Sequence, residues 1–159
     1  GHAVVRSIND AVQDWAVTRM RKITYVFKGT NCLTDTNSFL CADVEIAEDP
    51  TTGYDPDLLM RLNTSGHLII AGQSLSHSIN CTMRDLLAHW QGPKSTISLL
   101  QDCCSVDANL EAAGATGPRP QPYFRPNKFW NEMTAAGVRV VRAQEVMLGK
   151  NHSSPGKLR

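Results

Sequence analysis

This sequence has no long apolar run and almost no net charge. None of its apolar stretches approaches the roughly 18 residues that a membrane-spanning helix needs. The N-terminus also lacks the basic, then apolar, then small-residue layout of a secretion signal. Because 16 Lys and Arg oppose 15 Asp and Glu, the net charge is +1, which gives no long-range field to attract nucleic acid or anionic lipid. We therefore expect neither a membrane nor a nucleic-acid partner.

The cysteines lack the spacing of a metal site or a disulfide framework. There are five, an odd number, and the one close pair, Cys103 and Cys104, is adjacent rather than separated as metal ligands are. We expect an intracellular, reducing compartment. The adjacent pair could act in redox or metal chemistry, but small thiols beside an apolar strand are more typical of packing.

The chain does have the size and apolar content of one domain, with 159 residues of which 42% are hydrophobic. Apolar periodicity and Gly, Pro and capping signals predict four helices: 3–20, 56–62 capped by Asp55, one with its inner face between Ile79 and Trp90, and one capped by Asn127 and ended by Gly137. Short apolar runs predict strands at 22–27, 67–71, 96–100 and 138–141. A polar excursion at 30–55, a loop at 107–126 and a flexible tail at 149–159 complete the chain.

Helices and strands alternate, and the strands are continuous apolar runs, as in strands that are covered on both faces. The sequence therefore predicts an α/β domain with a parallel sheet over residues 1–148. In such sheets the active crevice lies beyond the carboxyl ends of the strands. The segments that follow the predicted strands, and that we examine for chemistry, are Lys28, 72–78, 102–105 and 142–144.

Two of these segments carry candidate catalytic residues. Lys28 ends a buried strand, where partial desolvation would make its proton easier to lose; the alternative is a lysine that extends to solvent. Ser78 stands at the opening of the next helix, where backbone donors and the helix dipole would stabilise an oxyanion. The alternative there is that Ser76 or Ser78 is only an N-cap.

The same segments resemble a known family. YVFKG with TDTNS, then HLIIAGQSLSHSINCT, then ISLLQDCCS are similar to the second half of the isochorismatase-like cysteine hydrolases, which include nicotinamidases. The resemblance covers most of the chain up to about Val146. It implies a three-layer α/β/α fold with a parallel sheet in the order 3-2-1-4-5-6, of which this chain would supply strands 3 to 6.

The resemblance also implies roles for single residues. The family hydrolyses amides or enol ethers with an Asp, Lys and Cys triad, and Lys28 matches the lysine. A cis peptide would fall at Gln73-Ser74, and the amides of Ser74 and Ser78 would form the oxyanion hole. The candidates for lining the substrate pocket are Asn31, Ser38, Phe39 and His77.

The sequence departs from the family at the nucleophile, because Ser78 stands where the family has cysteine. A serine hydroxyl is a much poorer nucleophile than a thiolate and needs a strong adjacent base. Ser78 is therefore either an introduced substitution or the mark of a naturally inactive relative. His77 could activate Ser78, but we interpret it as a spacer. Cys81 could be a relocated nucleophile, but packing is the favoured interpretation.

The second departure from the family concerns the catalytic residues that would precede Gly1. In the family, the triad Asp and the Asp and His residues of any metal site come before the region that resembles Gly1-His2. We therefore expect no cofactor in this chain, with a divalent metal belonging to the absent portion. Two central strands would have to come from the N-terminal portion of the same precursor or from a protein partner, within an oligomer or larger assembly. Alone, the polypeptide would not fold. If active, it would hydrolyse a small-molecule amide or a related C–N or C–O bond; the alternative is a catalytically dead scaffold subunit.

Overall fold

The structure, a computed structural model, describes residues 4–105 and 124–147. Most of the loop predicted at 107–126 and the whole tail predicted at 149–159 lie outside these residues. The described elements run in the order α1 (Arg6–Arg19), η1 (Pro50–Thr52), α2 (Pro56–Asn63), β1 (Leu68–Gln73), η2 (Leu75–Ile79), α3 (Asn80–His89), η3 (Lys94–Thr96), β2 (Ile97–Ser105), α5 (Pro126–Ala135), β3 (Arg139–Val141) and α6 (Ala143–Met147).

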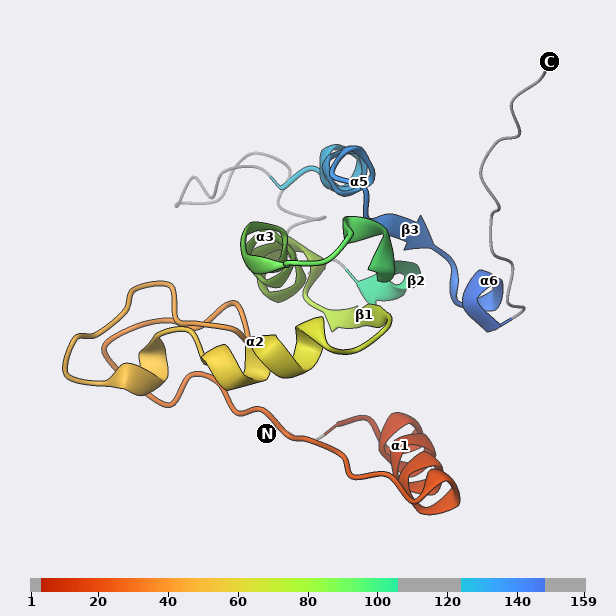
Figure 1. The fold of residues 1–159 in the computed structure, drawn as a ribbon, viewed down its shortest axis with the longest axis horizontal. Coiled ribbons are helices and arrows are strands. Elements are labelled where there is room, and N and C mark those ends of the chain that lie inside the picture. Colours follow the sequence, from red (N-terminus) through yellow and green to blue (C-terminus); the bar gives the residue numbers. More distant parts are fainter. Residues whose placement is uncertain (1–3, 106–123, 148–159) are drawn as a thin grey trace.

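The fold is α/β with a parallel sheet, as the sequence predicts. The described strands form one sheet in the order β1-β2-β3, and both neighbouring pairs are parallel. Ile70 lies opposite Leu99, and Leu99 lies opposite Val140. Figure 1 shows α3 and α5 on one side of this sheet and α6 on the other. Each parallel connection thus passes through a helix, as parallel pairing requires.

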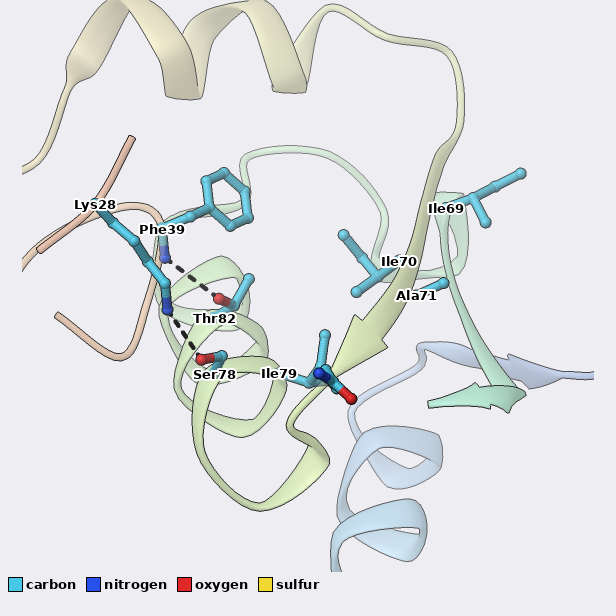
Figure 2. A pocket seen from close by; sticks show the side chains of 9 residues that line it. Lys28, Phe39, Ile69, Ile70, Ala71, Ser78, Ile79 and Thr82 are labelled. Carbon is cyan, nitrogen blue, oxygen red and sulfur yellow. Dashed lines mark hydrogen bonds between the residues drawn. The ribbon is translucent and has the colours of Figure 1, made fainter. Parts of the chain in front are cut away.

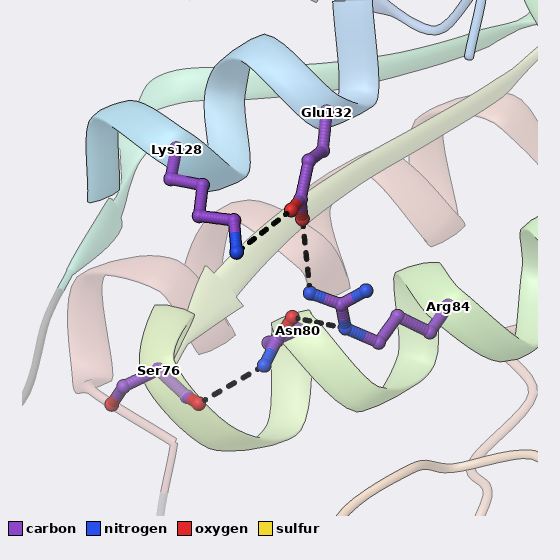
Figure 3. Close-up of polar contacts among 5 residues, drawn as sticks. All are labelled: Ser76, Asn80, Arg84, Lys128 and Glu132. Carbon is purple, nitrogen blue, oxygen red and sulfur yellow. Dashed lines mark hydrogen bonds and ion pairs between the residues drawn. The ribbon is translucent and has the colours of Figure 1, made fainter. Parts of the chain in front are cut away.

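The hydrophobic core lies between the sheet and the helices α3 and α5. Its members come from all three strands and from α2, η2, α3 and α5; the largest that are fully buried are Leu75, Met83, Leu86, Ile97, Leu99, Phe129 and Met133. On the surface of the same two helices, Arg84 of α3 forms an ion pair of 3.0 Å with Glu132 of α5, and Lys128 reaches the other oxygen of Glu132 (Figure 3). Core side chains of both helices are therefore buried in one cluster, and the Arg84–Glu132 ion pair joins the helices at the surface.

Two helix boundaries show how local signals act. Asp55 caps α2 as predicted, because its carboxylate accepts hydrogen bonds from the amides of Asp57 and Leu58. The predicted cap at Asn127 is wrong: α5 begins at Pro126, whose fixed φ suits the first helical position. Gly137 ends α5 with a φ of +91°, a conformation that strains other residues, and β3 follows.

The strand predicted at 22–27 is not formed. These residues are extended but belong to no strand, and the side chains of Tyr25, Val26 and Phe27 are 61%, 44% and 85% exposed. A strand exists only when a neighbour pairs with it, and β1, the strand nearest in sequence, pairs only with β2 within the described residues. Residues 22–27 therefore form no strand despite their β-branched and aromatic composition, because no described strand pairs with them.

Helix α1 forms where the apolar spacing predicts it, yet it buries no residue. Its apolar face, which includes Ile8, Val12 and Trp15, remains exposed, and Figure 1 shows the helix standing apart from the sheet. One hydrogen bond of 3.1 Å, from Gln13 Nε2 to the Tyr25 hydroxyl, joins it to the extended segment. The second helical layer of the predicted three-layer fold is therefore represented at the sheet by α6 alone within the described residues.

None of the helices in residues 4–105 and 124–147 combines the length and the apolar character that crossing a membrane requires.

Candidate functional site

The candidate site forms where Lys28 meets the turn after β1. The Lys28 ammonium donates hydrogen bonds to the Ser78 hydroxyl at 2.9 Å and to the backbone carbonyl of Asn37 at 2.6 Å. Lys28 and Ser78 are 50 residues apart in the chain. The two candidates that the sequence analysis selected independently are thus direct neighbours in the fold.

The turn between β1 and α3 has an unusual backbone. The Gln73-Ser74 peptide is cis, at the place where the family resemblance implies such a bond, and Gly72 has a φ of +132°. A single π-helical turn, η2, follows, in which the amide of Ile79 donates to the carbonyl of Ser74 at 2.9 Å. This wider turn carries Ser78 on the surface that faces Lys28.

Neither Ser76 nor Ser78 is an N-cap, so that alternative is wrong. The first residues of η2 and α3 are not capped by any side chain. The Ser76 hydroxyl is instead bonded to the Ser74 hydroxyl at 2.7 Å and to His77 Nδ1 at 3.0 Å. His77 therefore contacts Ser76 and not Ser78, and the hydrogen-bond partner of Ser78 is Lys28.

A polar face of α3 attaches the long loop to the site. Ser78 at the end of η2 and Thr82 and Asp85 in α3 follow one another at helical spacing. The Thr82 hydroxyl accepts a hydrogen bond from the Phe39 amide at 3.4 Å, as Figure 2 shows, and Asp85 lies 3.8 Å from the Cys41 thiol. These contacts hold the loop from Lys28 to Cys41 along the helix. The i, i+4, i+7 spacing of these three polar residues was the sequence signal for the contacts, and it was not used to predict them.

The loop itself is ordered by its own polar side chains. The buried Thr52 hydroxyl donates to the Asp49 carbonyl at 2.7 Å and accepts from the Ile46 amide at 2.8 Å. Asn31 donates to the Asp49 carboxylate at 2.8 Å, and the hydrogen bonds of Asp49 hold its pKa below the usual range. A segment with no periodic apolar pattern is thereby given one conformation.

Two cavities meet at this loop. The first, of about 260 Å³, is lined by residues of β1 and α3 together with Lys28, Phe39 and Ser78; Figure 2 shows Lys28 and Ser78 on one side and the β1 side chains on the other. The second, of about 470 Å³, lies between residues 26–31 and 50–58 and shares Lys28 and Phe39 with the first. Its volume is in the range of small-molecule sites.

The predicted pocket residues divide into two groups. Phe39 lines both cavities and Asn31 lines the larger one. Ser38 is 2% exposed and its hydroxyl accepts from the Leu40 amide, so it stabilises the loop. His77 lines neither of the two cavities. Gln73 lines the smaller cavity, and its side-chain oxygen accepts a hydrogen bond from the Ser105 hydroxyl.

Two opposing effects act on the pKa of Lys28. Partial burial of the ammonium lowers the pKa of Lys28, although the residue as a whole is exposed, and the nearby charge of Asp43 and the Cys81 thiol act in the opposite direction. Burial is also the main cause that raises the pKa of the Cys81 thiol, followed by Asp43 and Asp85. A thiol with a raised pKa is a weak nucleophile, which favours packing as the role of Cys81.

None of the five cysteines forms a disulfide bond. Cys103 and Cys104 lie inside β2, not after it, because β2 continues to Ser105. Neighbouring strand residues face opposite sides, so Cys104 packs against the core while Cys103 is exposed. Burial is the main cause that raises the pKa of the half-buried Cys104 thiol, and the packing interpretation applies to Cys104 alone.

Within residues 4–105 and 124–147, no group of three or more His, Cys, Asp and Glu side chains is placed to hold a metal ion.

No protein-family model matches the chain, and no curated protein matches it. Two solved structures match it: the yeast nicotinamidase Pnc1p bound to the inhibitor nicotinaldehyde, and the yeast nicotinamidase Pnc1p. Each is 18% identical, with a TM-score of 0.49, and the matches cover 84% and 83% of this chain and 51% and 50% of those chains. The chain thus spans about half the length of these proteins, and the match carries no conclusion about its chemistry.

Proposed function

We propose that this chain carries the lysine and nucleophile positions of an isochorismatase-like hydrolase site, with serine in place of the nucleophilic cysteine. The observation that supports it is the 2.9 Å hydrogen bond between Lys28 and Ser78 at the edge of the smaller cavity. The substrate class would be a small amide or a molecule with a related C–N or C–O bond. The amides of Ser74 and Ser78 would bind the oxyanion.

The chain by itself is expected to be inactive. Attack by a serine requires a base that accepts the hydroxyl proton, and the group bonded to the Ser78 hydroxyl is an ammonium, which donates. The imidazole of His77 is bonded to Ser76 instead. Activity would therefore require a carboxylate or another base from outside the described residues, next to Lys28.

That group would come from a polypeptide that completes the sheet, either the N-terminal portion of the same precursor or a separate partner. Within the described residues β1 has a strand on one side only, and Ile69 on this strand is 47% exposed. Unpaired strand edges bind other strands readily. Added strands would cover Ile69 and give residues 22–27 the neighbour that they lack.

The second candidate function is that of a catalytically dead scaffold subunit. Two observations favour it: within residues 4–105 and 124–147 the Ser78 hydroxyl is bonded only to a donor, and the exposed apolar face of α1 is suited to an interface. A scaffold needs the fold and this surface, but it does not need an activated residue at position 78.

The substitution Ser78→Cys distinguishes the two functions. If the site is a hydrolase site, the new thiol lies beside the Lys28 ammonium, which stabilises a thiolate, so alkylation should begin at a lower pH than for an exposed thiol. Peptide mass spectrometry of iodoacetamide-treated protein gives the rate at each cysteine, and the exposed Cys32 serves as the internal reference. The matched control, Ser78→Cys with Lys28→Met, should lose the advantage because the cation is gone.

If the new cysteine reacted no faster than Cys32 at any pH between 6 and 9, the site would not be preorganised for nucleophilic chemistry, and the scaffold function would be favoured. If it reacted early but Lys28→Met had no effect, Lys28 would not be the activating residue.

A further inference from the structure

A carboxylate in the long loop is connected to the Lys28–Ser78 pair through a single residue. Asp43 accepts two hydrogen bonds from Asn37: its Oδ1 from the backbone amide at 3.1 Å and its Oδ2 from the side-chain amide at 2.5 Å. The carbonyl of the same Asn37 accepts the hydrogen bond of the Lys28 ammonium at 2.6 Å. Asp43 therefore holds in place the group that orients Lys28.

The Asp43 residue is itself fixed. Its backbone amide donates to the carbonyl of Asp35 at 2.8 Å, and the neighbouring amide of Ala42 donates to the carbonyl of Thr52 at 2.8 Å. These two hydrogen bonds join the segment around Asp43 to an earlier and to a later part of the loop. The contacts that lead from Asp43 through Asn37 and Lys28 to Ser78 are thus made by a loop of defined conformation.

The charge of Asp43 also reaches the site directly. Its effect on Lys28 opposes the desolvation that lowers the pKa of the ammonium, and its effect on Cys81 adds to the burial that raises the pKa of that thiol. The charged or titratable groups that act on Lys28 are Asp43 and Cys81; Ser78 and Asn37, its hydrogen-bond partners, are neutral. Burial has the larger effect on the pKa of Lys28, and Asp43 is the carboxylate whose charge opposes it.

We propose that Asp43 is a positioning residue of the Lys28–Ser78 site, which holds the Asn37 carbonyl against the Lys28 ammonium and supplies the negative charge that faces it. The catalytic importance of Asp43 rests on the proposed function. Its contact with Asn37 and the effect of its charge on Lys28 involve only residues of this chain and do not depend on that function. A loop carboxylate that tunes the lysine would let the loop control the site without contacting Ser78.

The test is the pH profile of Lys28 acetylation in the full chain. Limited labelling with acetic anhydride, read by peptide mass spectrometry, gives the pH midpoint of each lysine, and Lys128, whose side chain is 72% exposed on α5, is the reference within each sample. Asp43→Asn removes the charge but keeps one acceptor. We expect the Lys28 midpoint to move to lower pH, with severalfold faster acetylation below the midpoint, while Lys128 does not change.

Asp35→Asn is the matched control, because it removes the same charge from the same loop and the contacts of Asp35 to Asp43 and Thr34 use its backbone carbonyl. It should leave the Lys28 midpoint unchanged. Asp43→Glu keeps the charge and should stay close to the parent protein, which separates an electrostatic effect from a loss of folding. An unchanged midpoint in Asp43→Asn, or one that rises, would overturn the proposal.

The outcomes also separate this inference from the proposed function. If the Lys28 midpoint falls in Asp43→Asn while the Ser78→Cys thiol reacts like Cys32, the role of Asp43 stands and the hydrolase site fails. If the thiol is activated and the Lys28 midpoint does not respond to Asp43, the hydrolase site stands and the role of Asp43 is overturned.

Discussion

Residues 4–28 and residues 58–141 of this chain have similar apolar sequence patterns. The apolar side chains are buried in the second region and not in the first. Helix α1 and the extended segment 22–27 have the apolar spacing of a helix and a strand, and none of the residues from 4 to 28 is buried. In the second region, the same kinds of pattern form a sheet with α3 and α5 packed on it. An apolar pattern therefore stabilises a fold only when a second surface is present to cover it.

The largest expected effect is a difference in hydrogen exchange between these two regions. An isolated helix of 14 residues is marginal in water, so the α1 amides should exchange almost as in an unfolded chain. The β2 amides from Ile97 to Leu100 should exchange only through global unfolding, which costs about 5 kcal/mol or more in a typical domain. Hydrogen–deuterium exchange with mass spectrometry on the full chain measures both.

Two results would change this comparison. Equal protection of α1 and β2 would mean that the apolar face of α1 is covered in solution. Equal and rapid exchange in both would bear out the expectation that the polypeptide does not fold alone, including the region that has its own core.

Paired truncations should show the same contrast in the free energy of unfolding. Leu99→Ala removes a fully buried side chain from the central strand and should cost about 2–5 kcal/mol. Ile8→Ala removes a similar side chain that is 57% exposed on α1, and its effect should stay within about 0.5 kcal/mol. Urea unfolding followed by circular dichroism gives both values. A cost above about 1 kcal/mol for Ile8→Ala would show that α1 packs against something in the folded protein.

A smaller effect is expected from the helix caps. Asp55→Ala removes the two hydrogen bonds that cap α2 and should cost about 1 kcal/mol of unfolding free energy, whereas Asp55→Asn should restore most of it.

Val5, at the start of α1, makes no side-chain cap. Val5→Ser should therefore raise the helicity of α1 without changing the urea midpoint, because α1 is not coupled to the core. A shift of the midpoint by Val5→Ser would contradict that independence.

The smallest effect concerns the ion pair between α3 and α5. Arg84 and Glu132 are 56% and 36% exposed in their side chains, so a double-mutant cycle with Arg84→Ala and Glu132→Ala should give a coupling of only about 0.2–1 kcal/mol. The coupling should fall as sodium chloride rises from 0.05 to 0.5 M, because salt screens exposed charges. A coupling above about 2 kcal/mol at high salt would mean that this pair, and not the core, determines how the two helices pack.

Local signals predicted most of the helices and strands in the second region. Apolar runs located β1, β2 and β3, Asp55 and Gly137 marked helix ends, and the continuous apolar character of the strands indicated a parallel sheet. These signals depend on residues close in sequence. The short helix α6 was missed, because its first amide is capped by Asp102 Oδ1, which lies 41 residues away.

The candidate site could be predicted only in part. Lys28 and Ser78 were selected from their positions after apolar runs, but each retained a plain alternative, and only their contact in the fold ties them together. Asn37, Asp43 and Thr82 were not selected, because loop hydrogen bonds leave no periodic trace in a sequence. His77 was a pocket candidate implied by the family resemblance, and its side chain contacts Ser76 because adjacent side chains of a helical turn diverge.

The sequence by itself determined most of the helices and strands between residues 56 and 141, that the sheet is parallel, and which turns could carry polar chemistry, because spacing, capping and turn residues act over a few positions. The tertiary structure alone decided three other things: that residues 22–27 stay unpaired, that the apolar face of α1 stays exposed, and that the Lys28 ammonium meets the Ser78 hydroxyl under the influence of Asp43. Each of these depends on which surfaces meet across tens of residues, and no local pattern carries that information.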